Sequence, residues 1–269
     1  MRLAFAGIGE IHGGQMTNNP NGASLQVLKA VEDGWNAFCK APWTFLLFQI
    51  LVGVVMLPFA LMSAAGGARI ANFKEVAGLH PILGWLLLIV GLIGYVIVVL
   101  WGIVGLIRGS WTALEGRKPE FKDFTRWDGA SSGRLLGSMI LVWIVIAIAS
   151  VIAYLIGLGL GQINQALILI PSIALAIFGI WFMVTQKFLV QASLLGSKNS
   201  ADALSAGVEV INPSWWIVLW LVIIEATIHA IAATFHYGGL FVAVPVLVCV
   251  STAAYRQLFG AEDRTGLQG

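Results

Sequence analysis

The stretch PSWWIVLWLVIIEATIHAIAATFHY, residues 213–237, decides the fold, because it is long and apolar enough to cross a bilayer yet carries three ionisable side chains. These are Glu225, His229 and His236, and a helix places them within about 60° of one another around its axis. A carboxyl group inside a membrane helix costs a few kcal/mol to expose to lipid. Other helices should therefore cover this face, and the packing of the whole chain has to accommodate it.

The composition of the chain is that of a polytopic membrane protein. Of its 269 residues, 59% are hydrophobic and 10% are charged, whereas soluble globular domains carry about 25% charged residues. The net charge of +2 is too small to indicate a nucleic-acid partner. Two distant cysteines, Cys39 and Cys249, offer neither a disulfide framework nor a cysteine metal site. The sequence therefore predicts an all-α protein embedded in a bilayer.

Six transmembrane helices are predicted from the apolar runs, which cover residues 43–64, 82–107, 135–156, 166–186, 213–237 and 240–259. Gly238 and Gly239 are expected to break the chain between the fifth and sixth spans. Three amphipathic segments alternate with pairs of spans, at residues 24–40, 108–134 and 199–212. This order suggests a threefold internal hairpin repeat, with shared interface chemistry as the alternative.

The first amphipathic segment is predicted to be an interfacial helix. Ser24 is its candidate N-cap, and the helix should end before Pro42. Its predicted apolar face consists of Leu25, Leu28, Val31, Trp35 and Phe38. Elsewhere, small residues at G-x-x-x-G spacing, such as Gly105 and Gly109, favour close helix packing within the chain over a dimer interface.

The predicted membrane domain covers residues 24–259 and lies between two flexible ends. Gly, Asn and Pro dominate residues 1–23, which predicts a flexible arm in which Met16 is an alternative start. The tail GAEDRTGLQG, residues 260–269, is predicted to be disordered. All fifteen Lys and Arg residues except Arg69 and Lys74 lie on one side of the spans. The positive-inside rule then places both termini and the three amphipathic segments in the cytoplasm.

Glu225 is the one carboxylate well inside a predicted span, and two roles for it remain open. Together with His229, one turn away, it can pass a proton or a cation between the outer face and the middle of the membrane. Alternatively, it is a packing group that hydrogen-bonds Gln49, Gln186 or a backbone carbonyl. A cofactor site is a third interpretation, with His229 or His236 as an axial ligand of a haem or a chlorin, although no C-x-x-C-H motif accompanies it.

The loop at residues 108–134 is a candidate contact surface for anionic lipid headgroups or for a partner protein, because basic residues stand beside aromatic ones. The candidate residues are Arg117, Lys118, Phe121, Lys122, Phe124, Arg126 and Trp127. Interleaved carboxylates make a solvated, self-paired surface the alternative. The sequence contains no G-x-S-x-G, no H-E-x-x-H and no P-loop, so we do not expect an enzyme.

Two motifs carry a resemblance to a known family. The first, G-W-x-x-F-x-x-x-P-W, spans residues 34–43, and the second, R-G-x-W-x-x-L-x-G-x-x-P-x-F-x-D-F, spans residues 108–124. With the six-span layout, they resemble the bacterial proteins related to the membrane domain of glycerophosphoryl diester phosphodiesterase, over residues 24–259. The resemblance implies a non-enzymatic module in a bacterial cytoplasmic or internal membrane, and it transfers no catalytic residue.

Two functions follow as predictions. The first is an integral membrane accessory, assembly or membrane-organising protein that contacts lipid and another membrane protein or a second copy of itself. The alternative is a small transporter or proton-coupled channel that uses Glu225 and His229.

Overall fold

The computed structural model describes residues 25–71 and 81–268, and the regular elements in these ranges are helices. Six of them are long and apolar enough to cross a membrane. They are α2 (Pro42–Ala71), α3 (Pro81–Leu114), α5 (Gly129–Gly161), α6 (Leu169–Thr185), α9 (Trp215–Thr234) and α10 (His236–Phe259). The prediction of an all-α, multi-pass membrane protein is confirmed. The arm at residues 1–23, Ser24, Lys74 and His80 lie outside the described residues.

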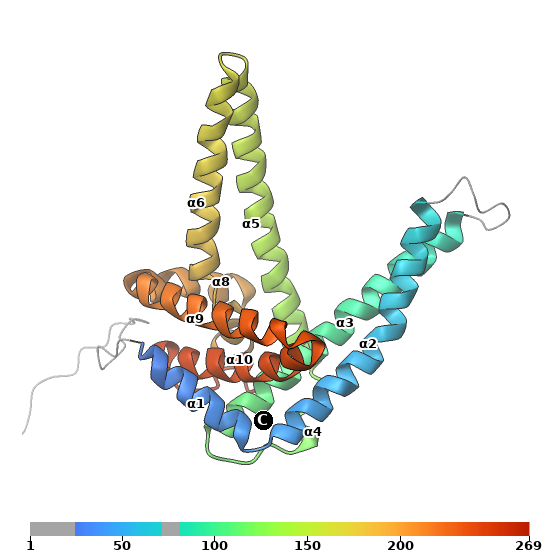
Figure 1. Ribbon diagram of the computed structural model, residues 1–269, viewed down its shortest axis with the longest axis vertical. Coiled ribbons are helices and arrows are strands. Elements are labelled where there is room, and N and C mark those ends of the chain that lie inside the picture. Colours follow the sequence, from blue (N-terminus) through green and yellow to red (C-terminus); the bar gives the residue numbers. More distant parts are fainter. Residues whose placement is uncertain (1–24, 72–80, 269) are drawn as a thin grey trace, which may run out of the picture.

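The spans form three hairpins that splay from a common base (Figure 1). The α2–α3 and α5–α6 hairpins diverge from this base, while α9 and α10 run across it next to α1 (Val27–Cys39). In the most apolar 18-residue window of α5 none of the residues is buried, whereas 61% are buried in that of α10. The six spans therefore do not form one parallel bundle, and two hairpins leave long apolar faces for lipid or for partner helices.

The predicted order of short segment, span and span occurs three times. The three units are α1–α2–α3, α4–α5–α6 and α8–α9–α10, where α4 is Phe121–Thr125 and α8 is Ser200–Ile211. The second predicted amphipathic segment, residues 108–134, contains the end of α3, the five-residue helix α4 and the start of α5. The third hairpin turns at Phe235, between the end of α9 and the start of α10, and not at Gly238 and Gly239, which lie inside α10.

The buried face of α1 differs from the predicted one. It consists of Val27, Ala30, Gly34, Ala37 and Phe38. A Cβ at Gly34 would lie 2.5 Å from the backbone N and Cα of Val250 in α10, so the two helices are in close contact there. Leu28 and Trp35, which were predicted to share the apolar face, are 77% and 51% exposed. The close contact of α1 with α10 therefore depends on its small residues, while Leu28 and Trp35 lie outside the buried face.

Phe124 is the aromatic centre of the base. Its ring lies 4.9 Å from that of Phe45 and 5.3 Å from that of Phe48, measured between centroids. Its ring fills the space beside Gly109 in α3, and its backbone carbonyl and the ring of Phe48 fill the space beside Gly105, so that a Cβ at either glycine would clash. This glycine pair therefore serves packing within the chain, as predicted, and Phe124 is fully buried. Its prediction as an outward contact residue was wrong, because α3 offers it a glycine-lined groove.

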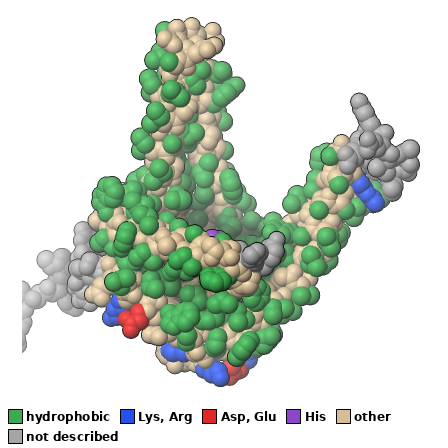
Figure 2. Space-filling view, viewed as in Figure 1, with side chains coloured by type: hydrophobic (Ala, Val, Ile, Leu, Met, Phe, Trp, Pro, Cys, Tyr) green, Lys and Arg blue, Asp and Glu red, His purple; other side chains and the backbone are tan. Residues whose placement is uncertain are grey.

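Charged side chains gather at the base, and hydrophobic side chains cover the two diverging hairpins (Figure 2). One basic side chain stands apart near the far end of α2, where Arg69 occupies the last turn of the helix. The described ends of the chain also lie at the base, since α1 and the segment after α10 are both found there (Figure 1). The charge asymmetry expected from the sequence is thus reproduced in space.

Candidate functional site

Glu225 lies on α9, and its buried carboxylate is held by two partners. One oxygen forms an ion pair with the ammonium of Lys187, which follows the end of α6. The other oxygen accepts a hydrogen bond of 2.8 Å from the hydroxyl of Ser251 in α10. Lys187 Nζ also donates to Ser251 Oγ at 3.1 Å. The three side chains therefore join the end of α6 to the third hairpin.

The histidines do not complete the predicted proton path. His229 is exposed, and among the described residues it has no hydrogen bond or ion pair with Glu225. His236 is the first residue of α10, and its side chain lies outside what the structure describes. No group of three His, Cys, Asp or Glu residues in the described ranges is close enough to hold a metal ion.

The predicted packing partners of Glu225 were also wrong. Gln186 donates its amide to the carbonyl of Leu204 at 3.1 Å, and the buried Oε1 of Gln49 has no partner among the described residues. Lys187 is the actual partner, and its side chain is 21% exposed while that of Glu225 is 10% exposed. Removal of either member of a buried ion pair lowers the stability of the fold, since the remaining charge is left without compensation. The geometry is thus that of a cross-link between helices.

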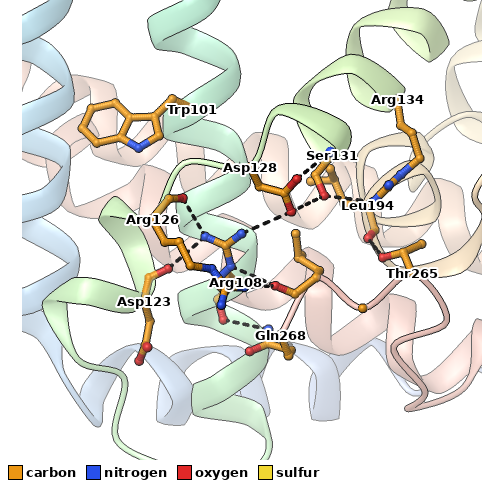
Figure 3. A network of polar contacts seen from close by, with 12 residues as sticks. Trp101, Arg108, Asp123, Arg126, Asp128, Ser131, Arg134, Leu194, Thr265 and Gln268 are labelled. Carbon is orange, nitrogen blue, oxygen red and sulfur yellow. Dashed lines mark hydrogen bonds and ion pairs between the residues drawn. The ribbon is translucent and has the colours of Figure 1, made fainter.

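A second polar centre lies at the base, where Arg108 is 2% exposed near the end of α3. Its Nε donates to the carbonyl of Leu267 at 3.0 Å, and its Nη1 donates to the carbonyl of Arg126 at 2.9 Å. The same Nη1 lies 3.3 Å from the carbonyl of Asp123, and Nη2 lies 3.6 Å from a carboxylate oxygen of Asp128 (Figure 3). Arg108 therefore connects α3 to the following loop and to the C-terminal tail.

The C-terminal tail is ordered over residues 260–268, so the prediction of disorder was wrong. The carboxylate of Asp263 accepts hydrogen bonds from the backbone N–H groups of Thr265, Gly266 and Gln268, at 3.1, 3.0 and 2.8 Å. These bonds close a tight loop that directs Leu267 into a fully buried position. Because the anchoring arginine lies 159 residues away in the chain, the local sequence carries no sign of this docking.

The tail also ties the base to the segment after α6. Thr265 donates its hydroxyl to the carbonyl of Leu194, and the backbone N–H of Arg264 donates to the carbonyl of Leu195 at 2.9 Å (Figure 3). We call the assembly of Arg108, residues 115–134 and residues 260–268 the basal plate. Arg108 and Trp101 bind the backbone carbonyls of residues 123, 125 and 126, so this part of the basal plate is held in place.

Asp128 is the N-cap of α5 within the basal plate. It accepts hydrogen bonds from the backbone N–H of Ser131 at 2.9 Å and from the Ser131 hydroxyl at 2.7 Å. Partial burial opposes ionisation of this carboxyl, but the two Ser131 hydrogen bonds and the charges of Arg108 and Arg134 outweigh it. The pKa of Asp128 is therefore lowered from its usual value of 3.8.

The remaining candidate contact residues fall into two groups. Arg117 pairs with Glu115 at 2.6 Å and Lys122 with Glu120 at 2.8 Å, while Arg126 donates to the carbonyl of Leu267 at 2.7 Å. These three basic side chains therefore have partners within the chain, as expected for a solvated surface whose charges pair with one another. The outward surface consists of Lys118, which is exposed, together with Phe121 and Trp127, which are 42% and 54% exposed.

Comparison with protein-family models gives no match, and neither the curated proteins nor the solved structures include one with significant similarity to the chain.

Proposed function

We propose that this chain is an integral membrane accessory or assembly protein that acts through contacts of its basal plate. The observation that supports the proposal is the exposure of Phe121 and Trp127 on a segment held by Arg108 and the tail. Exposed aromatic side chains on a rigid support are typical of protein interfaces, because they bury a large area at little cost in conformational entropy. Lys118 beside them would strengthen contact with an acidic surface.

The proposed partner is another membrane protein or a second copy of the chain. The open sides of the α2–α3 and α5–α6 hairpins support this proposal, since their apolar faces are available to lipid or to partner helices in the same membrane.

The family resemblance supports a bacterial cytoplasmic or internal membrane, and the gathering of basic residues at the base supports a cytoplasmic base. An impermeant thiol reagent should then label Lys118→Cys only from the cytoplasm.

The experiment is gentle native purification of matched variants, with mass spectrometry of the proteins that co-purify. Trp127→Ala and Lys118→Glu should lose a stoichiometric partner that the unaltered protein retains. Lys198→Glu is the control, because Lys198 is an equally exposed lysine outside the basal plate. Retention of every co-purifying protein by both plate variants would refute the proposal.

A proton-coupled transporter is the second candidate function, and the buried Lys187–Glu225 pair supports it. Ionisable groups at membrane depth frequently serve ion or proton movement. Since His229 is exposed, the relay would have to involve Lys187 and Ser251 instead. A flux in liposomes that disappears in Glu225→Gln, with folding preserved, would favour this candidate. Absence of any flux from the unaltered protein would eliminate it.

A further inference from the structure

A polar pocket lies at the base between α1, the end of α3 and the end of α10, apart from both sites described above. Its volume is about 340 Å³, and its lining includes Asp33, Asn36, Lys40, Arg256 and Gln257. This volume exceeds that of one phosphate or carboxylate group and lies near the lower end of the range of small-molecule sites. The pocket is therefore large enough for a small polar ligand or for the headgroup of a lipid.

Two hydrogen-bond donors of this pocket have no partner. Nη1 of Arg256 and Nε2 of Gln257 are both buried, and neither forms a hydrogen bond with any described residue. A buried donor without an acceptor destabilises a folded protein. The two donors belong to adjacent residues that both line this cavity, so an acceptor from outside the described part of the chain would satisfy them.

The donors are held in place by their neighbours. The guanidinium of Arg256 stacks on the ring of Trp111, with its central carbon 4.8 Å from the ring centroid. The other end of the Gln257 amide accepts the backbone N–H of Gln26 at 2.9 Å, which fixes the direction of Nε2. A stacked guanidinium keeps its N–H edge free for a planar or tetrahedral anion. The geometry is thus prepared for an acceptor before a ligand arrives.

The lining of the pocket carries two positive charges, on Arg256 and Lys40, and one negative charge, on Asp33. The ammonium of Lys40 donates a 2.7 Å hydrogen bond to the carbonyl of Ala113, another residue of the lining. Charge-assisted hydrogen bonds from arginine and lysine are the usual means of holding phosphate. Asp33 is the acidic group of the lining, and it would accept a hydrogen bond from a hydroxyl on the organic part of a phosphate ester.

We propose that this pocket binds the phosphate group of a small phosphate ester through Arg256, Gln257 and Lys40. The ester is either a soluble molecule or the headgroup of a phospholipid, since the pocket lies at the base where the spans end. The site is independent of the contact function proposed above, because it uses no residue of the outward surface of the basal plate.

The test measures phosphate binding to the purified full-length protein in neutral detergent. Inorganic phosphate is titrated at constant ionic strength, and the change in melting temperature and the heat of binding are recorded. Arg256→Gln should weaken binding at least tenfold. Asn36→Asp should weaken it as well, and this second variant leaves the Arg256–Trp111 stack intact if the first does not fold. Arg264→Gln, which removes an exposed arginine outside the pocket, is the control and should bind as the unaltered protein does.

A second experiment distinguishes a soluble phosphate ester from a phospholipid headgroup. The same four proteins are reconstituted in nanodiscs of phosphatidylcholine with or without phosphatidylglycerol. Stabilisation by inorganic phosphate that depends on Arg256 identifies a soluble ester, and stabilisation only by phosphatidylglycerol, with the same dependence, identifies a lipid headgroup. If neither probe stabilises the protein, or if Arg264→Gln weakens binding as much as Arg256→Gln does, the proposal is wrong.

Discussion

At the scale of single residues, Arg108 determines how the base is held together. Its guanidinium donates hydrogen bonds to three backbone carbonyls and forms an ion pair with the carboxylate of Asp128. All four of these partners lie outside α3. Arg108 begins the R-G-x-W motif at residues 108–124, but its sequence neighbours do not show that it is buried. A basic residue at the end of a span is most often exposed at the interface, and here the tail covers it instead.

Replacing Arg108 by Ala should destabilise the protein by about 3 kcal/mol, because backbone carbonyls lose their donor and the carboxylate of Asp128 loses the positive charge beside it. Thermal unfolding in detergent measures this loss, and carboxypeptidase should also digest the tail faster in the variant. Arg117→Ala is the control. Its side chain is 62% exposed and pairs only with Glu115, so its effect should stay within about 0.5 kcal/mol. Equal stability of the two variants would show that the network does not hold the base.

The Lys187–Glu225 pair allows a double-mutant cycle. Glu225→Leu alone should cost about 3 kcal/mol, since it leaves a partly buried ammonium with Ser251 as its remaining partner. Adding Lys187→Met should restore much of the stability, because the uncompensated charge is gone. Unfolding of the four proteins in detergent gives the coupling energy. If the double variant is as unstable as the sum of the single variants, the pair is not a structural cross-link.

Asp128 gives the basal plate a defined response to acid. Its pKa is lowered on folding, so its stabilisation is fully present above the unfolded value of about 3.9 and is lost as the pH falls through the folded value. We expect its contribution to stay constant between pH 7 and 5, and to be lost as the pH falls below about 4. Asp128→Asn keeps an N-cap residue but removes the charge, so the melting temperature of this variant should fall less on acidification.

Glu209→Gln controls for the general effect of removing a carboxylate, because Glu209 is exposed on α8. Its acid profile should follow that of the unaltered protein. An unchanged profile in Asp128→Asn would mean that the carboxylate of Asp128 does not contribute to stability.

For single residues, the sequence predicted correctly that Glu225 is covered by other helices, but it did not predict the partner of its carboxylate. Glu225 was expected to require cover by other helices, and it is 8% exposed. Lys187 was not recognised as its partner, because 38 residues separate the two and no helical spacing relates them. His229 shares a helical face with Glu225 by spacing, yet it is exposed, since the neighbours of α9 cover only part of its length.

At the scale of elements, glycines decide which helices approach closely. Gly34 in α1 faces the backbone of Val250 with no space for a Cβ, while Gly53 in α2 has open space around it. Gly34→Ala should therefore destabilise the protein by about 1–3 kcal/mol despite the better helix propensity of alanine. Gly53→Ala should be neutral or stabilising. Thermal unfolding of the two variants checks the prediction, and a stable Gly34→Ala would show that α1 is not packed on α10.

Two helices are followed by a glycine in the same backbone conformation. Gly116 follows α3 and Gly260 follows α10, and their φ values are 90° and 95°. Only glycine adopts this backbone conformation without strain, so the two helices end by the same means. Other elements were misjudged. Residues 108–134 were predicted to be an amphipathic segment with Phe124 as a contact residue, but α4 covers only Phe121–Thr125 and Phe124 is buried.

At the scale of the whole molecule, the number and order of the spans could be predicted, but their arrangement could not. Length and hydropathy identify a helix that can cross a bilayer, and the described part of the chain contains six such helices. The divergence of α2–α3 from α5–α6 depends on the basal contacts of Arg108, Phe124 and the tail, which join residues far apart in the chain. No local pattern encodes these contacts.

The central claim is that the exposed surface of the basal plate contacts a partner, and site-specific photo-cross-linking in native membranes tests it most directly. A photoreactive amino acid at position 127 or 121 should yield one defined protein adduct, while the same group at position 198 should not. Adducts with lipid alone from positions 121 and 127, or identical adducts from all three positions, would contradict the claim.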